Sequence, residues 1–171
     1  MSQTVQTVQT DLPAPTGQGE LIYRFEGSLS DLYPIGVFPE GIRYHNEFSA
    51  RITAGPFAGG RLSGIDHFVL RPDGVGVIVA PEVIEHDGRR VSGDVRGYVV
   101  PPEGAPVPPL EAVIDPTFTW PEVPFRVTGS VLFRTAVPEL DHLNRTVAVV
   151  EGTVVLATGE LRVEARAVPA P

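Results

Sequence analysis

Asp66 is the one charged residue on the more apolar face of a predicted strand that spans residues 61–71. Alternation places five side chains on this face: Leu62, Gly64, Asp66, Phe68 and Leu70. Burying a carboxylate in such a row is costly unless it is hydrogen-bonded or protonated, and desolvation raises its pKa toward the neutral range. The pattern therefore predicts a general acid or base in an apolar cavity. The alternative is a structural carboxylate that caps a bulge or pairs with Arg96 or Arg145.

Histidines and tyrosines could complete such a site. His67 and His142 could form a proton relay with Asp66 or provide two ligands of a metal. Isolated histidines are more often surface or core residues, so we expect no metal. In a regular strand His67 points away from the face of Asp66, unless a bulge intervenes. Tyr98 is a candidate donor to a substrate carbonyl, or else packs at a barrel rim. The expected catalytic residues are Asp66, His67 and Tyr98.

Several further residues could contact a substrate. Glu82 stands in an apolar row, and Trp120, the single tryptophan, lies in a long predicted loop. Asn144, in the sequence LNRT (143–146), could orient a ligand or satisfy buried backbone groups. The expected substrate-binding residues are Tyr44, Glu82, Trp120, Phe133, His142 and Asn144.

Composition excludes several classes of function. All 13 basic residues are arginine and the net charge is −8, which argues against nucleic acid as a partner and excludes Schiff-base catalysis by lysine. Cysteine is absent, so there is no disulfide framework or thiolate chemistry. No signal peptide, membrane-length apolar run or cofactor motif is apparent, so we expect a cofactor-free cytoplasmic protein.

The elements that must position these residues are predicted to be strands. Glycine and proline number 18 each, which favours many short strands joined by turns. We expect strands near residues 20–27, 42–52, 61–71, 75–84, 91–99, 125–135, 142–152, 153–159 and 160–168, with residues 75–84 buried on both faces. This all-β pattern predicts a single antiparallel β-barrel of about eight or nine strands.

The remaining segments are predicted to be a tail and lid loops. Residues 1–18 are polar and are expected to form a disordered tail, and residues 19–171 a single barrel domain. Residues 30–41 and 101–124 are predicted to be long lid loops, with one or two helical turns near residue 112. Glycines at inward positions, such as Gly64 and Gly93, would turn barrel corners or leave room for a ligand.

Two motifs suggest a family. ITAGPFAGGRLSG…DHFVLRPDG and FRTAVPELDHLNRTVAVVEG resemble the bacterial and fungal family known as domain of unknown function 3237, over residues 20–168. The resemblance implies a small barrel similar to allene oxide cyclase and the calycins, with a central cavity, but no common reaction. The chain departs from the family at His67 and His142, where relatives tend to have tryptophan. It also departs at Val79, where they tend to have an acidic residue.

Three functions are consistent with these observations. The first is a cofactor-free enzyme that holds a hydrophobic, polyketide-like molecule and catalyses an intramolecular cyclisation, isomerisation or dehydration, in which fixing the reactive conformer supplies much of the acceleration. The second is a lipocalin-like carrier without turnover. The third is a metal-assisted hydrolase or lyase that uses His67, His142 and a carboxylate. A homo-oligomer is compatible with all three.

Overall fold

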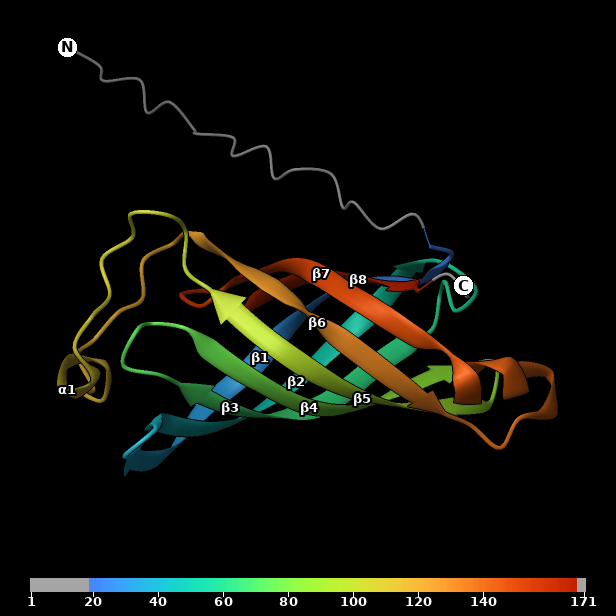
Figure 1. Cartoon of the computed structure of the whole chain (residues 1–171), viewed down its shortest axis with the longest axis horizontal. Coiled ribbons are helices and arrows are strands. Elements are labelled where there is room, and N and C mark those ends of the chain that lie inside the picture. The colour runs from blue at the N-terminus through green and yellow to red at the C-terminus, as the bar shows by residue number, and fades with distance from the viewer. Residues whose placement is uncertain (1–18, 169–171) are drawn as a thin grey trace, which may run out of the picture.

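A computed structural model describes residues 19–168 and shows a closed antiparallel barrel in which each strand pairs with its neighbours in chain order and β8 pairs with β1 (Figure 1). The strands are β1 (Leu21–Phe38), β2 (Gly41–Ala54), β3 (Arg61–Leu70), β4 (Gly76–His86), β5 (Arg89–Val100), β6 (Pro124–Arg134), β7 (Val147–Val155) and β8 (Glu160–Ala167). The predicted all-β barrel is confirmed, with eight strands. The tail expected at residues 1–18 lies outside the described residues.

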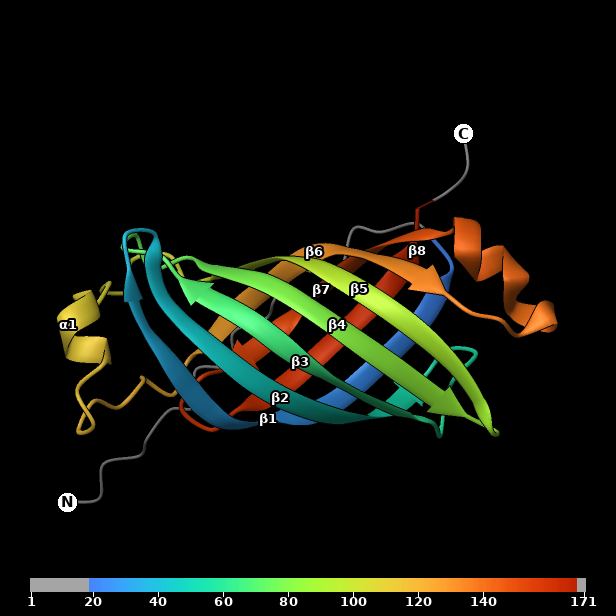
Figure 2. The ribbon, with the colours of Figure 1, turned by 90° about the horizontal axis from the view of Figure 1, so that it is seen from below.

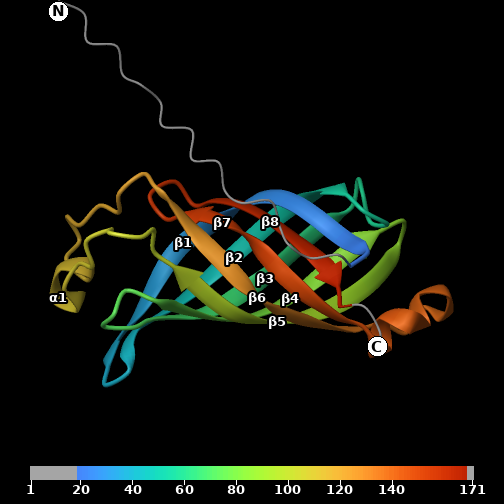
Figure 3. The same cartoon turned by 45° about the horizontal axis from the view of Figure 1, so that its top comes forward.

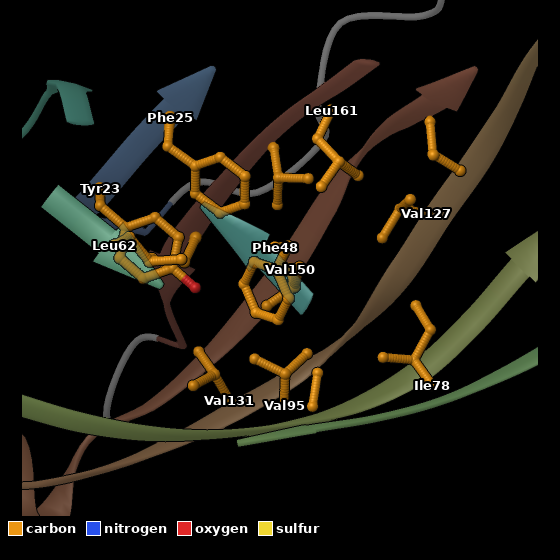
Figure 4. Close-up of a cluster of buried hydrophobic side chains, with 14 of the residues drawn as sticks. Tyr23, Phe25, Phe48, Leu62, Ile78, Val95, Val127, Val131, Val150 and Leu161 are labelled. Carbon is orange, nitrogen blue, oxygen red and sulfur yellow. The ribbon is translucent and has the colours of Figure 1, made fainter. Parts of the chain in front are cut away.

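Alternating burial along the strands produces the lumen. In β3, Leu62, Asp66, Phe68 and Leu70 are buried, whereas Arg61, Ile65 and His67 are exposed. The same two-residue period runs through β5 and most of β6. Because successive side chains of a strand point to opposite faces, each strand has one lumen face and one solvent face. Figure 4 shows lumen-facing side chains from several strands meeting in the interior.

Strands β1 and β4 differ from the predictions made for their sequences. Residues 30–38, expected in a lid loop, continue β1, and their hairpin with β2 projects beyond the barrel at the end where α1 (Leu110–Val113) lies (Figure 2). Register shifts near Leu29 and Pro34 let this segment pair although proline lacks an N–H. Strand β4, expected to be buried on both faces, exposes Val83 because nothing among residues 19–168 covers the outer face there.

The predicted strand at residues 142–152 is wrong at its start. Residues 138–145 form a 3₁₀ helix, η1 (Pro138–Arg145), at the end of the barrel opposite α1 (Figure 3). Proline at its start and acidic side chains in its first turn favour this helical segment. Strand β7 then takes up part of two predicted strands, 142–152 and 153–159, which reduces the count to eight. No helix among residues 19–168 has the length and hydropathy needed to cross a membrane.

Inward glycines let the backbones of neighbouring strands approach each other closely. Gly97 of β5 faces Gly129 of β6, and a Cβ at Gly129 would overlap the carbonyl oxygen of Arg96 and lie 2.9 Å from Cα of Gly97. This pair lies where β5 and β6 touch backbone to backbone, so it turns the wall rather than making room for a ligand.

Gly129→Ala is therefore expected to lower the free energy of unfolding by about 3 kcal/mol, because backbone atoms must move to admit the methyl group. Gly93→Ala is the matched control. The three atoms nearest to a Cβ there all belong to the Glu82 side chain, with Oε1 at 2.7 Å, and this flexible side chain can shift, so we expect a loss of about 1 kcal/mol. Urea unfolding of both variants measures the difference. Equal losses would contradict the backbone contact.

Candidate functional site

The lumen contains a cavity of about 80 Å³. One end of the barrel is filled, because Leu62, Ile84 and Phe133 are fully buried there. At the other end the half-buried side chains of Leu29, Trp120 and Leu156 form the rim. The walls are Tyr23, Phe25, Tyr44, Asn46, Phe48, Asp66, Phe68, Ile78, Ala80, Glu82, Val95, Val99, Val127, Val150, Val154, Leu161 and Val163.

Asp66 enters this cavity at a break in the barrel wall. Strands β3 and β4 pair at residues 61–64 with 82–85 and again at 69–70 with 76–77, and the ladder is interrupted between them. Pro81, which has no N–H to donate, lies in the interruption. The N–H of Val79 donates instead to Oδ1 of Asp66, at 3.2 Å. Oδ1 of Asp66 thus takes the place of the missing backbone acceptor, and Oδ2 is left free to contact a ligand.

Burial determines the acidity of Asp66. The residue is 8 % exposed, and desolvation raises its pKa to about 7, although the hydrogen bond from Val79 acts in the opposite direction. Neither Arg96 nor Arg145 pairs with it: Arg96 pairs with Asp94, and Arg145 with Asp141. Near neutral pH Asp66 can therefore either take up or release a proton.

Glu82 is a second buried carboxyl group of the cavity. It lies between Gly64 of β3 and Gly93 of β5, so no neighbouring side chain crowds it on either strand. The hydroxyl of Tyr23 donates to its Oε1 at 2.9 Å. Burial raises the pKa of Glu82 to about 7 in spite of this bond, which lowers it, and burial also raises the pKa of Tyr23.

Tyr23→Phe is expected to raise the pKa of Glu82 further, because the variant removes the donor that stabilises the carboxylate. The free energy of unfolding should fall by about 1–3 kcal/mol at pH 8, where the charged carboxylate loses its partner. Carboxyl ¹³C titration and thermal unfolding measure the two effects. Phe25→Leu, a nearby apolar change, is the control. A Glu82 pKa that stays the same or falls in Tyr23→Phe would contradict this geometry.

Asn46 is a third polar residue of the cavity. Asn46 is 2 % exposed, and no donor among residues 19–168 reaches its Oδ1. In the β2–β3 ladder it lies directly opposite Asp66. Asn46 and Asp66 therefore project into the lumen side by side.

The rest of the lining limits what can bind. Aromatic and aliphatic side chains form most of the wall, and none of the described residues in that lining is basic. An anion would meet two buried acids without a counter-charge, which is unfavourable. The lining therefore disfavours an anionic ligand.

Four of the predicted site residues line this cavity: Asp66, Tyr44, Glu82 and Trp120. Trp120 packs edge-on against Phe118 and Phe125, which holds the indole at the rim. Phe133 is fully buried and packs edge-on against Tyr23, but it belongs to the filled end of the barrel rather than to the lining.

The other four predicted residues lie elsewhere. His67 is on the solvent face of β3, where its ring packs against that of His45, because no bulge displaces it from regular alternation. Tyr98 is also on the outer face and is 49 % exposed. His142 is an exposed residue of η1. None of these three reaches the cavity, so their expected roles there do not follow from the structure.

Asn144 has the structural role that was the alternative to ligand binding. Its Oδ1 accepts from the N–H of Thr135 at 2.8 Å, and its Nδ2 donates to the carbonyl oxygen of Thr135 at 3.0 Å. The side chain thus ties η1 to the end of β6. Among residues 19–168, no group of three or more His, Asp or Glu side chains is placed to hold a metal ion.

Two residues of the site, Asn46 and Tyr23, were missed by the sequence analysis. Asn46 alternates with Tyr44 and Phe48, so its position on an inward face could have been identified. Tyr23 pairs with Glu82 across 59 residues, a contact for which the sequence contains no signal.

The fold and the site define a closed antiparallel β-barrel with an acidic, largely apolar lumen. Three solved structures share this fold. A protein of unknown function from Clostridium acetobutylicum has a TM-score of 0.67 and 21% identity, with 88% of this chain and 98% of that chain covered. A conserved protein of unknown function from Rhodopseudomonas palustris has a TM-score of 0.62 and 19% identity, with coverage of 91% and 100%. A beta-barrel like protein from Acinetobacter baumannii has a TM-score of 0.66 and 20% identity, with coverage of 90% and 97%.

These likenesses concern the fold alone. No family model matches the chain, and a search of curated proteins finds no match. Membership of the family known as domain of unknown function 3237 stays a prediction from its motifs.

Proposed function

We propose that the barrel binds an uncharged, mostly apolar small molecule in its lumen and catalyses an intramolecular isomerisation, cyclisation or dehydration of it. Asp66 takes a proton from the molecule, or returns one. The observation that carries this proposal is a desolvated carboxyl group with a pKa of about 7, one oxygen of which is open to a small cavity. A general base works best when its pKa lies near the working pH.

The size of the cavity restricts the substrate. At about 80 Å³ the cavity is much smaller than the roughly 300–1,000 Å³ of pockets that enclose a drug-sized ligand. The reacting part of a molecule fits, and the remainder of a polyketide-like chain would extend past Leu29, Trp120 and Leu156 at the rim. Holding the reacting part in one conformer among rigid walls lowers the entropic cost of an intramolecular reaction.

Proton exchange tests this proposal without knowledge of the natural substrate. Cyclohexanone, which is small and uncharged and has exchangeable protons beside its carbonyl group, is incubated with the protein in D₂O and followed by NMR. We expect protein-dependent incorporation of deuterium that increases as the pH rises through about 7, where the Asp66 carboxylate forms. Saturable binding without any exchange would favour a carrier instead.

A further inference from the structure

Among residues 19–168, Asn46 has the one buried side-chain polar atom without a hydrogen-bond partner: its Oδ1 accepts no hydrogen bond. Its neighbours Asp66 and Glu82 each have a hydrogen bond from within the barrel. A buried amide oxygen without a donor destabilises a protein by about 1–3 kcal/mol, so folding alone would favour leucine, which has nearly the same shape. The missing donor must therefore come from outside these residues, from water or from a bound molecule that displaces it.

The register places this amide beside the proposed base. Asn46 lies directly opposite Asp66, and opposed side chains of antiparallel strands have Cβ atoms about 4.5–5.5 Å apart. Tyr44 and Phe48, two residues away on either side of Asn46, form aromatic walls around the pair. A group bound to Asn46 would thus hold the adjacent atoms of the same molecule against the free oxygen of Asp66.

The chemistry of an amide identifies that group. An asparagine side chain presents a carbonyl acceptor and an NH₂ donor, which exchange places when the amide turns by 180°. A hydroxyl group can donate to the oxygen or accept from the nitrogen, so it satisfies the amide in either orientation. A hydrocarbon satisfies neither, and an anion is disfavoured by the two buried carboxyl groups.

We infer that Asn46 is a specificity residue that binds a hydroxyl group of the molecule in the lumen, which makes the ligand class uncharged alcohols and hydroxy ketones. This inference rests on the proposed function only in taking the lumen as the binding site, and it does not require turnover. In a hydroxy ketone, the hydroxyl on Asn46 would direct the carbon next to the carbonyl group toward Asp66.

Trp120, the single tryptophan, lines the cavity and reports binding by its fluorescence. The probes are cyclohexanol and methylcyclohexane, which differ by a hydroxyl in place of a methyl group. We expect the ratio of cyclohexanol affinity to methylcyclohexane affinity to be about fivefold to tenfold higher in the wild type than in Asn46→Leu, which is the effect of one hydrogen bond to a buried group. This comparison cancels the cost of removing the hydroxyl from water, which is the same for both proteins. Asn46→Leu should also raise the melting temperature by about 2–4 °C, because it eliminates an unpaired acceptor.

Val127→Ala is the control, because it enlarges the same cavity without changing a polar group and should preserve the ratio of the two affinities. The same ratio of the two affinities in the wild type and in Asn46→Leu would overturn the inference. A lower melting temperature in Asn46→Leu would also overturn it, since it would mean that Asn46 has a partner inside the protein. Tighter binding of cyclohexylammonium than of cyclohexanol would replace hydroxyl recognition by cation binding.

The two proposals can fail separately. If cyclohexanone exchanges no deuterium but cyclohexanol is preferred through Asn46, the proposed reaction is wrong and hydroxyl recognition stands. If exchange depends on Asp66 but Asn46→Leu leaves the ratio of the two probe affinities unchanged, the reaction stands and the role of Asn46 is wrong.

Discussion

Asp66→Asn is expected to lower the rate of protein-dependent deuterium exchange into cyclohexanone by about 10²–10⁴-fold, the usual contribution of a positioned acid or base. Asparagine removes the proton-accepting carboxylate but keeps an oxygen that can accept the N–H of Val79. The break in the β3–β4 ladder should therefore remain satisfied, and the cavity should keep its shape. NMR of the exchanging protons measures the rate, and Trp120 fluorescence measures whether the probe still binds.

Glu82→Gln is the matched control for this variant. Glutamine retains an oxygen for the Tyr23 hydroxyl and, like Asp66→Asn, removes one buried carboxylate. Both variants lose one negative charge, but only Asp66→Asn loses the proposed base. If Asp66 is the base, the exchange rate in Glu82→Gln should stay within about threefold of the wild type. An equal and large loss in Asp66→Asn and Glu82→Gln would indicate a shared electrostatic effect. Unchanged exchange in Asp66→Asn would remove Asp66 from the mechanism.

The two buried carboxyl groups are also expected to make the protein less stable as the pH rises from about 4 to about 7. Their folded-state pKa values, about 7, exceed the ordinary values of 3.8 for aspartate and 4.5 for glutamate. Between these limits the folded state holds more protons than the unfolded state, so deprotonation favours unfolding. At 1.36 kcal/mol per pK unit, each group lowers the free energy of unfolding by about 3–4 kcal/mol above pH 8.

Two variants isolate this effect from the titration of surface groups. Above pH 8, Asp66→Asn and Glu82→Gln should each unfold at a higher urea concentration than the wild type, because neither variant buries the charge that it replaces. Below pH 4 the differences should vanish, since wild-type Asp66 and Glu82 are then protonated. Urea unfolding at several pH values measures both limits. A variant that is less stable than the wild type at pH 8 would show that its carboxylate stabilises the fold.

Asp66, Glu82 and Asn46 together weaken the free protein, and this connects stability to function. Natural domains are stable by only about 5–15 kcal/mol, so two desolvated acids and an unpaired amide are a large cost. All three line one cavity, whereas most other inward positions of the barrel are apolar residues or glycine. Departures from ordinary packing that gather at one place are typical of functional sites.

Alternation was enough to predict much of this arrangement. The inward faces of β3, β5, β6 and β8 follow from a two-residue period between turns, and that period places Asp66 in the lumen. It also places His67 on the outside, against its predicted catalytic role. Glu82 was identifiable as an acid among apolar residues for the same reason.

The remaining features depend on contacts that local patterns do not encode. Residues 30–38 read as a loop because of their proline and glycine, yet pairing with β2 outweighs this local preference. Asn144 was expected near a ligand, but the backbone of Thr135, which it contacts, approaches it only in the folded chain. Pairing of Tyr23 with Glu82 requires closure of the barrel, and the break at Pro81 depends on the register of β3 against β4.

The most direct test of a buried acid poised for proton transfer is a ¹³C NMR titration of the Asp66 carboxyl group, assigned by its absence in Asp66→Asn. A midpoint at about pH 7 is expected, because burial outweighs the hydrogen bond from Val79. Bound cyclohexanol, by displacing water from the cavity, should raise the midpoint further. A midpoint near pH 4, unchanged by the probe, would mean that Asp66 is solvated and ionised like a surface carboxylate, and would contradict the proposed role of the lumen.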